Sequence, residues 1–179
     1  VVADGKSNPK WVAADRLSQA EHDKVAGAVL ATDDMALARA VQAEIERQLP
    51  ALPRADIARA SIEGNGKIIV TPDLLRALDV ANQLAPEHLE LCVDQPFDYL
   101  ARVRNAGSIF LGRSCPEALG DYLAGPNHTL PTSGTARFSS PLSVDDFVKK
   151  SQFTYHTAAA LKAVRGKIAA FARQEGLEA

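Results

Sequence analysis

The chain has 179 residues, with 20 basic and 22 acidic side chains and a formal net charge of −2. Hydrophobic residues make up 46% and charged residues 23%, a composition typical of a folded globular domain that excludes a disordered or collagen-like chain. No apolar run reaches the roughly 18 residues that a membrane span needs, and the near-zero charge argues against a nucleic-acid binder that relies on a basic surface. Two cysteines, Cys92 and Cys115, are too few for a disulfide scaffold and indicate a reducing, cytoplasmic compartment.

Strand and helix signals alternate from the start of the chain to about residue 111. Short apolar runs bounded by turn residues predict strands, and apolar residues at helical spacing predict helices between them. The predicted strands are 1–3, 26–31, 67–70, 89–93 and 108–111. The predicted helices are 9–22, 35–49, a short helix around Ile57, and 97–104. A further predicted helix is capped by Thr71 and Pro72 and ends at Gln83. This alternation predicts an α/β fold: a mainly parallel sheet with flanking helices, Rossmann-like but incomplete.

The segment from Gly112 to Pro141 is rich in Gly, Pro, Ser and Asn and is too long for an ordinary connector. Its apolar and aromatic residues favour a functional loop over a disordered one. Beyond it, a β-like stretch at 152–155 precedes an Ala-rich helix at 157–174 with an apolar stripe made of Leu161, Val164, Ile168 and Phe171. We therefore predict an α/β domain at 1–141 that carries the site, and a helical arm at 142–179 that packs on a partner subunit or on the α/β body.

Candidate chemistry centres on the four histidines. Gln19 and His22 are three residues apart near the end of the first predicted helix, so their side chains lie on one face. This pair could hold a metal ion if further ligands come from elsewhere. A Gln oxygen is an uncommon zinc ligand, however, and a solvated helix end explains the same pattern.

Glu87 and His88 form a second pair, between a predicted helix and a predicted strand. A carboxylate beside an imidazole supplies two groups that titrate near neutral pH if burial raises the pKa of the Glu. Pro86 favours a turn that would let both side chains reach one site. A surface Glu–His pair accounts for the pattern equally well.

Asp121 and His128 lie in the long irregular segment. Asp121 could be a metal ligand, and Gly120 would give the backbone room to present it. A capping Asp and a His bonded to a loop carbonyl are the simpler interpretation. The sequence contains no glycine fingerprint for a dinucleotide, no phosphate-binding loop and no serine nucleophile elbow.

Taken together, these segments resemble the histidinol dehydrogenase family. The motifs that carry the resemblance cover essentially the whole chain in order: Ala3-Asp4-Gly5 with Asn8-Pro9, ADRLSQAEHD at 14–23, NQLAPEHLEL at 82–91, NAGSIFLG at 105–112, GDY at 120–122 and GPNHTLPT at 125–132. The resemblance implies an enzyme that oxidises L-histidinol through L-histidinal to L-histidine, the last two steps of histidine biosynthesis, with two NAD and one zinc ion per site.

The resemblance also implies roles for individual residues. Gln19, His22 and Asp121 match zinc ligands, while Glu87 and His88 match the acid–base pair. His88 would take the alcohol proton, and Glu87 would help to activate water for the second oxidation. Zinc would mainly hold the imidazole and amine of the substrate. The matched substrate-binding residues are Gln19, His22, His88, Asp121 and Glu175.

Some parts implied by the resemblance fall outside this sequence. The fourth zinc ligand of the family, a histidine, would follow Ala179 directly, and the NAD site would lie upstream of Val1. The chain would then be the C-terminal portion of the enzyme, and its arm would reach into the neighbouring subunit of a homodimer with shared sites. We expect this chain by itself not to turn over substrate.

A hypothesis from another class is a non-catalytic binding module, in which Gln19, His22 and Asp121 hold a metal ion or a small imidazole ligand. A gene that begins near Val1 and ends at Ala179 would favour this alternative over an enzyme.

Overall fold

A five-stranded parallel sheet forms the centre of the computed structural model, which describes residues 1–177. The sheet has the order β3-β2-β1-β4-β5, and every pairing is parallel. The strands are β1 (Val2–Ala3), β2 (Val29–Thr32), β3 (Lys67–Val70), β4 (His88–Cys92) and β5 (Ser108–Leu111). The predicted parallel α/β sheet is confirmed, and its order is that of a Rossmann fold without the sixth strand.

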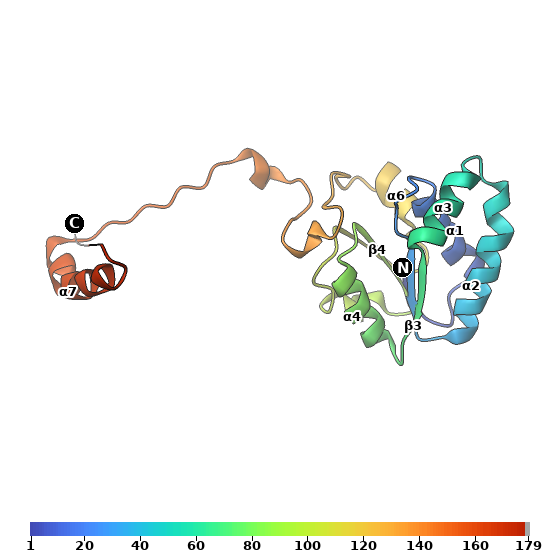
Figure 1. Cartoon of the computed structure of the whole chain (residues 1–179), viewed down its shortest axis with the longest axis horizontal. Coiled ribbons are helices and arrows are strands. Elements are labelled where there is room, and N and C mark those ends of the chain that lie inside the picture. Colours follow the sequence, from blue (N-terminus) through green and yellow to red (C-terminus); the bar gives the residue numbers. More distant parts are fainter. Residues whose placement is uncertain (178–179) are drawn as a thin grey trace. The chain divides into compact units, whose positions relative to one another are not determined.

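Helices cover both faces of this sheet (Figure 1). α1 (Pro9–Ala20), α2 (Met35–Gln48) and α3 (Ala55–Asn65) pack on one face, where buried residues such as Leu17 and Val41 form one core cluster. α4 (Leu74–Leu84) packs on the other face, where Leu78 and Leu91 belong to a second cluster that also contacts α5 (Pro96–Leu100) through Tyr99. Burying each such side chain contributes about 1.5–3 kcal/mol, so the two clusters fix the helices on the sheet.

Side-chain caps set where the helices begin. Asn8 accepts a hydrogen bond from the Lys10 N–H at the start of α1, and Asp34 accepts one from the Leu37 N–H at the start of α2. The cap of α4 is Asp73, not Thr71 and Pro72 as predicted. The Asp73 carboxylate satisfies a free N–H of the first turn, which is the usual role of an N-cap residue.

Other boundaries also differ from the prediction. α2 ends at Gln48 and continues as a short 3-10 helix, η1 (Leu49–Ala51). α3 extends to Asn65 and so is longer than the short helix predicted around Ile57. α5 ends at Leu100, four residues earlier than predicted. The segment 112–141 contains α6 (Glu117–Tyr122) and the 3-10 helix η2 (Thr135–Arg137), so it is not irregular throughout.

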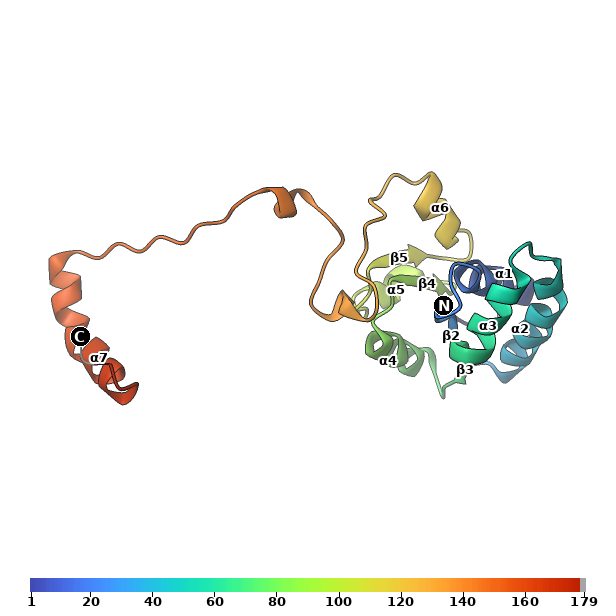
Figure 2. The ribbon, with the colours of Figure 1, turned by 45° about the horizontal axis from the view of Figure 1, so that its top comes forward.

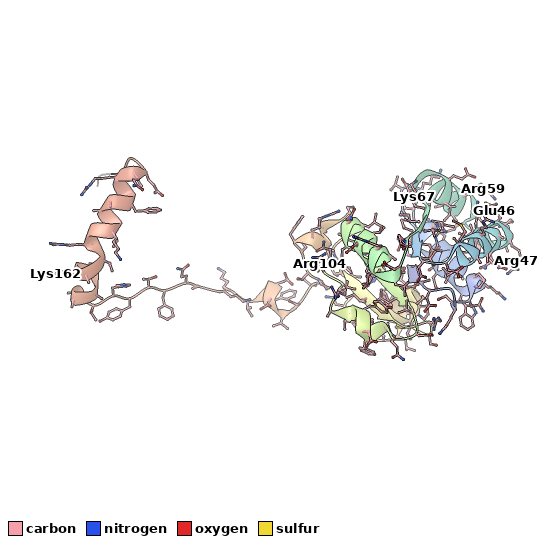
Figure 3. The ribbon with its side chains drawn as sticks, turned by 90° about the horizontal axis from the view of Figure 1, so that it is seen from below. Glu46, Arg47, Arg59, Lys67, Arg104 and Lys162 are labelled. Carbon is pink, nitrogen blue, oxygen red and sulfur yellow. The ribbon has the colours of Figure 1, made fainter. Side chains whose placement is uncertain are left out.

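Exposed ion pairs lie on the outer surface of α2 and α3. Arg59 of α3 lies 3.7 Å from Glu46 of α2, and both side chains project into solvent (Figure 3). Exposed pairs of this kind contribute at most about 1 kcal/mol. The packing of α3 on α1 and α2 therefore rests on the buried cluster beneath them.

The chain divides into two units, Val1–Val144 and Asp145–Ala179. The 3-10 helix η3 (Val144–Phe147) lies where the chain passes from one unit to the next, and the predicted β-like stretch at 152–155 forms no strand. The second unit contains α7 (Ala158–Gln174), capped by Thr157, on which Leu161, Ile168 and Phe171 are exposed. The predicted packing of this arm on a partner stays a prediction, and its last two residues lie outside the described part. No helix described in residues 1–177 could cross a membrane.

Candidate active site

The parallel topology brings the end of α1 to the start of β4. α1 follows β1 and runs back across the sheet, so its last turn lies at the edge where the neighbouring strand β4 begins with His88. Figure 2 shows these elements together with α6, which lies beside β5. The His88 Nδ1 atom is 3.3 Å from the Gln19 Oε1 atom, and the His88 side chain is only 8% exposed.

Helix α6 adds two carboxyl groups to this point. Glu117 and Asp121 are four residues apart in α6 and therefore share a face. The Glu117 Oε1 atom is 3.6 Å from His88 Nδ1, and the Asp121 Oδ1 atom is 3.8 Å from His88 Nε2. Both carboxyl side chains are less than 10% exposed, so the imidazole is enclosed by acidic groups.

A close contact between α6 and β5 makes this approach possible. A Cβ atom on Gly120 would lie 2.2 Å from Cε1 of Phe110, so only glycine fits at this position. The Phe110 ring, which is buried, stands 5.9 Å from the His88 ring. The glycine thus lets α6 come near enough for Asp121 to reach His88.

His128 completes the group from the segment after α6. Its Nδ1 atom is 3.0 Å from Asp121 Oδ1, and its ring stacks on that of His88 with centroids 5.7 Å apart and an interplanar angle of 9°. His88, Asp121 and His128 each offer one ligand atom, and these atoms lie within 4.8 Å of one another. Imidazole nitrogen and carboxylate oxygen are ligands that zinc accepts, so the donor set fits a zinc ion.

The burial of the group sets its protonation. Burial lowers the pKa of His88, although the Glu87 and Asp121 carboxylates act in the opposite direction. The ring is therefore neutral at pH 7. With Nδ1 facing the Gln19 oxygen, Nδ1 carries the proton and Nε2 is an acceptor, and the buried Nε2 has no hydrogen-bond partner within residues 1–177. Burial, with a smaller effect of Asp121, raises the pKa of Glu117 to about 8.

Comparisons with known proteins agree on one family. The sequence profile described as histidinol dehydrogenase matches residues 1–179. The chain belongs to the histidinol dehydrogenase family. It is 59% identical over 179 residues to the histidinol dehydrogenase of Bacillus cereus and 60% identical over 178 residues to that of Moorella thermoacetica, covering 100% and 99% of this chain and 42% of each relative. The crystal structure of histidinol dehydrogenase from Elizabethkingia anophelis matches with a TM-score of 0.82 and 38% identity, over 98% of this chain and 40% of that one.

The chain thus spans about two fifths of the length of the histidinol dehydrogenases that it matches. The predicted resemblance to the family is confirmed. That the chain corresponds to the C-terminal portion of the family's chain stays a prediction.

The structure brings together some of the residues predicted from the resemblance to histidinol dehydrogenases. Gln19, His88 and Asp121 meet at one point, as described above. His22, just past the end of α1, is exposed and is near enough to lower the pKa of His88, but it is not part of the ligand group formed with Asp121. Glu87 immediately precedes β4, where its backbone oxygen accepts a hydrogen bond from the Ser108 N–H.

Glu175, the remaining predicted residue, follows α7 in the second unit. The roles of all these residues stay predictions.

Sequence reasoning did not select two residues of the group. His128 was noted but was given a structural interpretation, and Glu117 was not noticed. The available signal was the spacing of Glu117 and Asp121, which places both on one face of a helix. This signal has meaning only once α6 is known to be helical.

Proposed function

We propose that this chain forms the acid–base and zinc-binding part of a histidinol dehydrogenase, which oxidises L-histidinol through L-histidinal to L-histidine. The observation that supports this function best is the state of His88. It is a buried, neutral imidazole whose Nε2 atom has no hydrogen-bond partner in the described chain and faces the carboxylate of Asp121. A base in this state can accept a proton from a substrate hydroxyl group.

In the first oxidation, His88 Nε2 takes the proton of the alcohol as the hydride leaves the same carbon. NAD, bound outside this chain, supplies the hydride acceptor in both oxidations. The protonated ring is stabilised by the nearby carboxylates of Glu87 and Asp121, both of which raise the pKa of His88. Gln19 accepts the Nδ1–H hydrogen bond and so holds the ring with Nε2 toward the substrate.

In the second oxidation, Glu87 helps to activate the water molecule that adds to the aldehyde carbon. Glu87 is half-buried next to His88, and its carboxylate raises the pKa of that ring. Two proton transfers of different kinds require two groups in different environments, and this adjacent pair provides them.

Gln19, His22 and Asp121 would hold a zinc ion, because imidazole nitrogen and carboxylate oxygen are donors that zinc accepts. His88, which also lies near Asp121, is assigned to the base and not to the metal. When bound, zinc supplies a positive charge that orients the imidazole and amine groups of L-histidinol. Of the chain's own residues, Asp121 provides a carboxylate held rigidly by α6, and His128 lies 3.0 Å from it. The exposed His22 would have to turn its side chain toward Asp121.

The assembly proposed for the enzyme is a cytoplasmic homodimer with shared sites. The exposed apolar side chains of α7, among them Leu161, Ile168 and Phe171, support an arm that packs on a neighbouring subunit. The free thiols of Cys92 and Cys115 fit a reducing compartment.

Zinc content and NAD reduction test this proposal. The chain should bind zinc, and Gln19→Ala and Asp121→Ala should each reduce the amount bound. The protein encoded by the complete reading frame should reduce NAD with L-histidinol, whereas residues 1–179 alone should not. His88→Ala in the complete protein should abolish turnover but leave zinc bound, because His88 acts as a base.

Unchanged zinc content in the Gln19 and Asp121 variants would contradict the assignment of the metal site. Zinc binding without any L-histidinol oxidation by the complete protein would favour the alternative, a non-catalytic module that binds a metal ion or an imidazole ligand.

A further inference from the structure

Glu90 lies behind the proposed site and is not among the residues that the function uses. It follows His88 by two residues in β4, so the two side chains lie on the same face of the sheet. Glu90 is 4% exposed. A carboxyl group buried to this degree requires partners that compensate for the loss of water.

The first partner is α6. The Glu90 Oε1 atom accepts a buried hydrogen bond of 2.9 Å from the backbone N–H of Glu117, the first residue of that helix. The N-cap residue of α6, Pro116, makes no side-chain cap bond. Glu90 therefore does for α6, from a neighbouring strand, what an N-cap side chain does within a helix. Because α6 has only 6 residues, such a tertiary contact matters to its position.

The second partner is Asp15 of α1, one helical turn before Gln19. Asp15, Glu90 and Cys92 form a group whose oxygen and sulfur atoms lie within 4.8 Å of one another. Glu90 Oε2 is buried and receives no hydrogen bond from any N–H or from any hydroxyl group within residues 1–177. Burial and the Glu90 carboxylate raise the pKa of Asp15 to about 7, so one proton held between the two carboxyl groups supplies the missing donor.

Glu90 thus connects the three elements that carry the proposed site: α1 with Gln19, β4 with His88, and α6 with Asp121. We propose that Glu90 is a positioning residue of this site, which holds α1 and α6 against β4 and thereby sets how closely Gln19 and Asp121 approach His88. This inference rests on the proposed function. It adds to that function the residue that fixes the distances from Gln19 and Asp121 to His88. Glu90 is not among the residues proposed to hold the zinc ion or to act as acid or base.

Variants of Glu90 distinguish the effect of losing its contacts with Glu117 and Asp15 from the effect of losing buried side-chain volume. Glu90→Ala removes both contacts. Glu90→Gln keeps an oxygen for the Glu117 N–H and offers an amide N–H to the Asp15 carboxylate, so it should rescue the geometry. Cys92→Ala is the matched control, because Cys92 lies on the same face of the same strand, is also buried, and makes no side-chain contact with α6 among those described.

The test uses Co(II) as the probe, titrated into the 179-residue chain and followed through its visible absorption spectrum. Glu90→Ala should weaken Co(II) binding about 10- to 100-fold, the loss typical of removing an outer partner of a metal site. Glu90→Gln should bind within about threefold of the wild type by the same reasoning. Cys92→Ala should lower the unfolding midpoint in urea and leave both the affinity and the spectrum unchanged.

If Glu90→Ala does not fold, Asp15→Ala and its rescue Asp15→Asn give the same comparison for the α1 contact alone. Equal Co(II) affinity in wild type and Glu90→Ala, or an equal loss in Cys92→Ala, would overturn the proposal. Failure of the wild-type chain to bind Co(II) would instead contradict the proposed metal site, so the two failures are distinguishable.

Discussion

Replacing Gly120 with alanine should damage the site far more than it damages the fold. Gly120 immediately precedes Asp121 in α6 and lies against the ring of Phe110. An added Cβ would lie 2.2 Å from Phe110 Cε1, whereas ordinary contact begins at 3.4 Å, so a gap of about 1.2 Å must open. Phe110 is 4% exposed and packs beside His88, so the helix moves more easily than the ring.

The effect on stability is small because two terms oppose each other. Overpacking a buried contact costs about 1–3 kcal/mol, and replacing a helical glycine with alanine returns about 1 kcal/mol. The net loss in the free energy of unfolding should be about 1 kcal/mol. The effect on the site is larger, because a misplacement of about 1 Å can reduce activity roughly 100-fold.

Gly64→Ala is the matched control. Gly64 lies in α3, and a Cβ atom there would meet nothing within 4 Å. This variant should gain about 0.5–1 kcal/mol in the free energy of unfolding and bind metal normally. Urea denaturation and Co(II) titration of both variants measure the two effects. If Gly120→Ala binds Co(II) as tightly as the wild type, α6 does not depend on the close contact with Phe110, and the reasoning is refuted.

Two further predictions concern buried titratable groups. The pKa of Asp15 is raised from its ordinary value of 3.8 to about 7, so the native state binds more protons than the unfolded state in this interval, and the free energy of unfolding should fall as the pH rises from about 4 to about 7. Asp15→Asn should flatten this slope in urea denaturation; an unchanged slope would show that Asp15 is ionised in the native state. Burial raises the pKa of the Cys92 thiol to about 12, whereas Cys115 is partly exposed, so iodoacetamide should label Cys115 in the native protein and Cys92 only in urea. Equal labelling rates would contradict the burial of Cys92.

The strands could be predicted from the sequence because each is a short apolar run between strong turn signals. Lys67–Val70 and Ser108–Leu111 were predicted with the observed bounds. Each directly follows a glycine, Gly66 or Gly107, that separates it from the preceding segment. Helix ends were less predictable, and α3 continues through Gly64 because its cap bonds to Gly66 outweigh the weak helix propensity of glycine.

The helix that matters most for the site could not be predicted in this way. α6 is short, follows Pro116 and contains Gly120, features that locally indicate a turn. It is held by contacts distant in sequence: Glu90 bonds to its first N–H, and Phe110 packs on its glycine. For the same reason Glu117 was missed, since its approach to His88 depends on a helix that only the folded sheet supports.

The site lies at the amino edge of the sheet, although ligands of open parallel sheets usually bind at the carboxyl edge, where the strand order reverses. In this chain the reversal lies between β1 and β4, and the loops there hold ion pairs of their own. Arg113, after β5, bonds to both Asp4 and Asp94, and Lys6 bonds to Asp94. The two cations and the two carboxylates thus pair with one another at the carboxyl edge.

The opposite edge has the electrostatics that a cation requires. α1 ends at the amino edge beside His88, so the negative end of its helix dipole lies at the site. The carboxylate of Asp121 adds to it, and His88, kept neutral by burial, brings no opposing charge. Parallel sheets commonly bind phosphate at the edge where helices begin. The edge where helices end has the opposite polarity and favours a metal ion. The residues around His88 lie at this second edge.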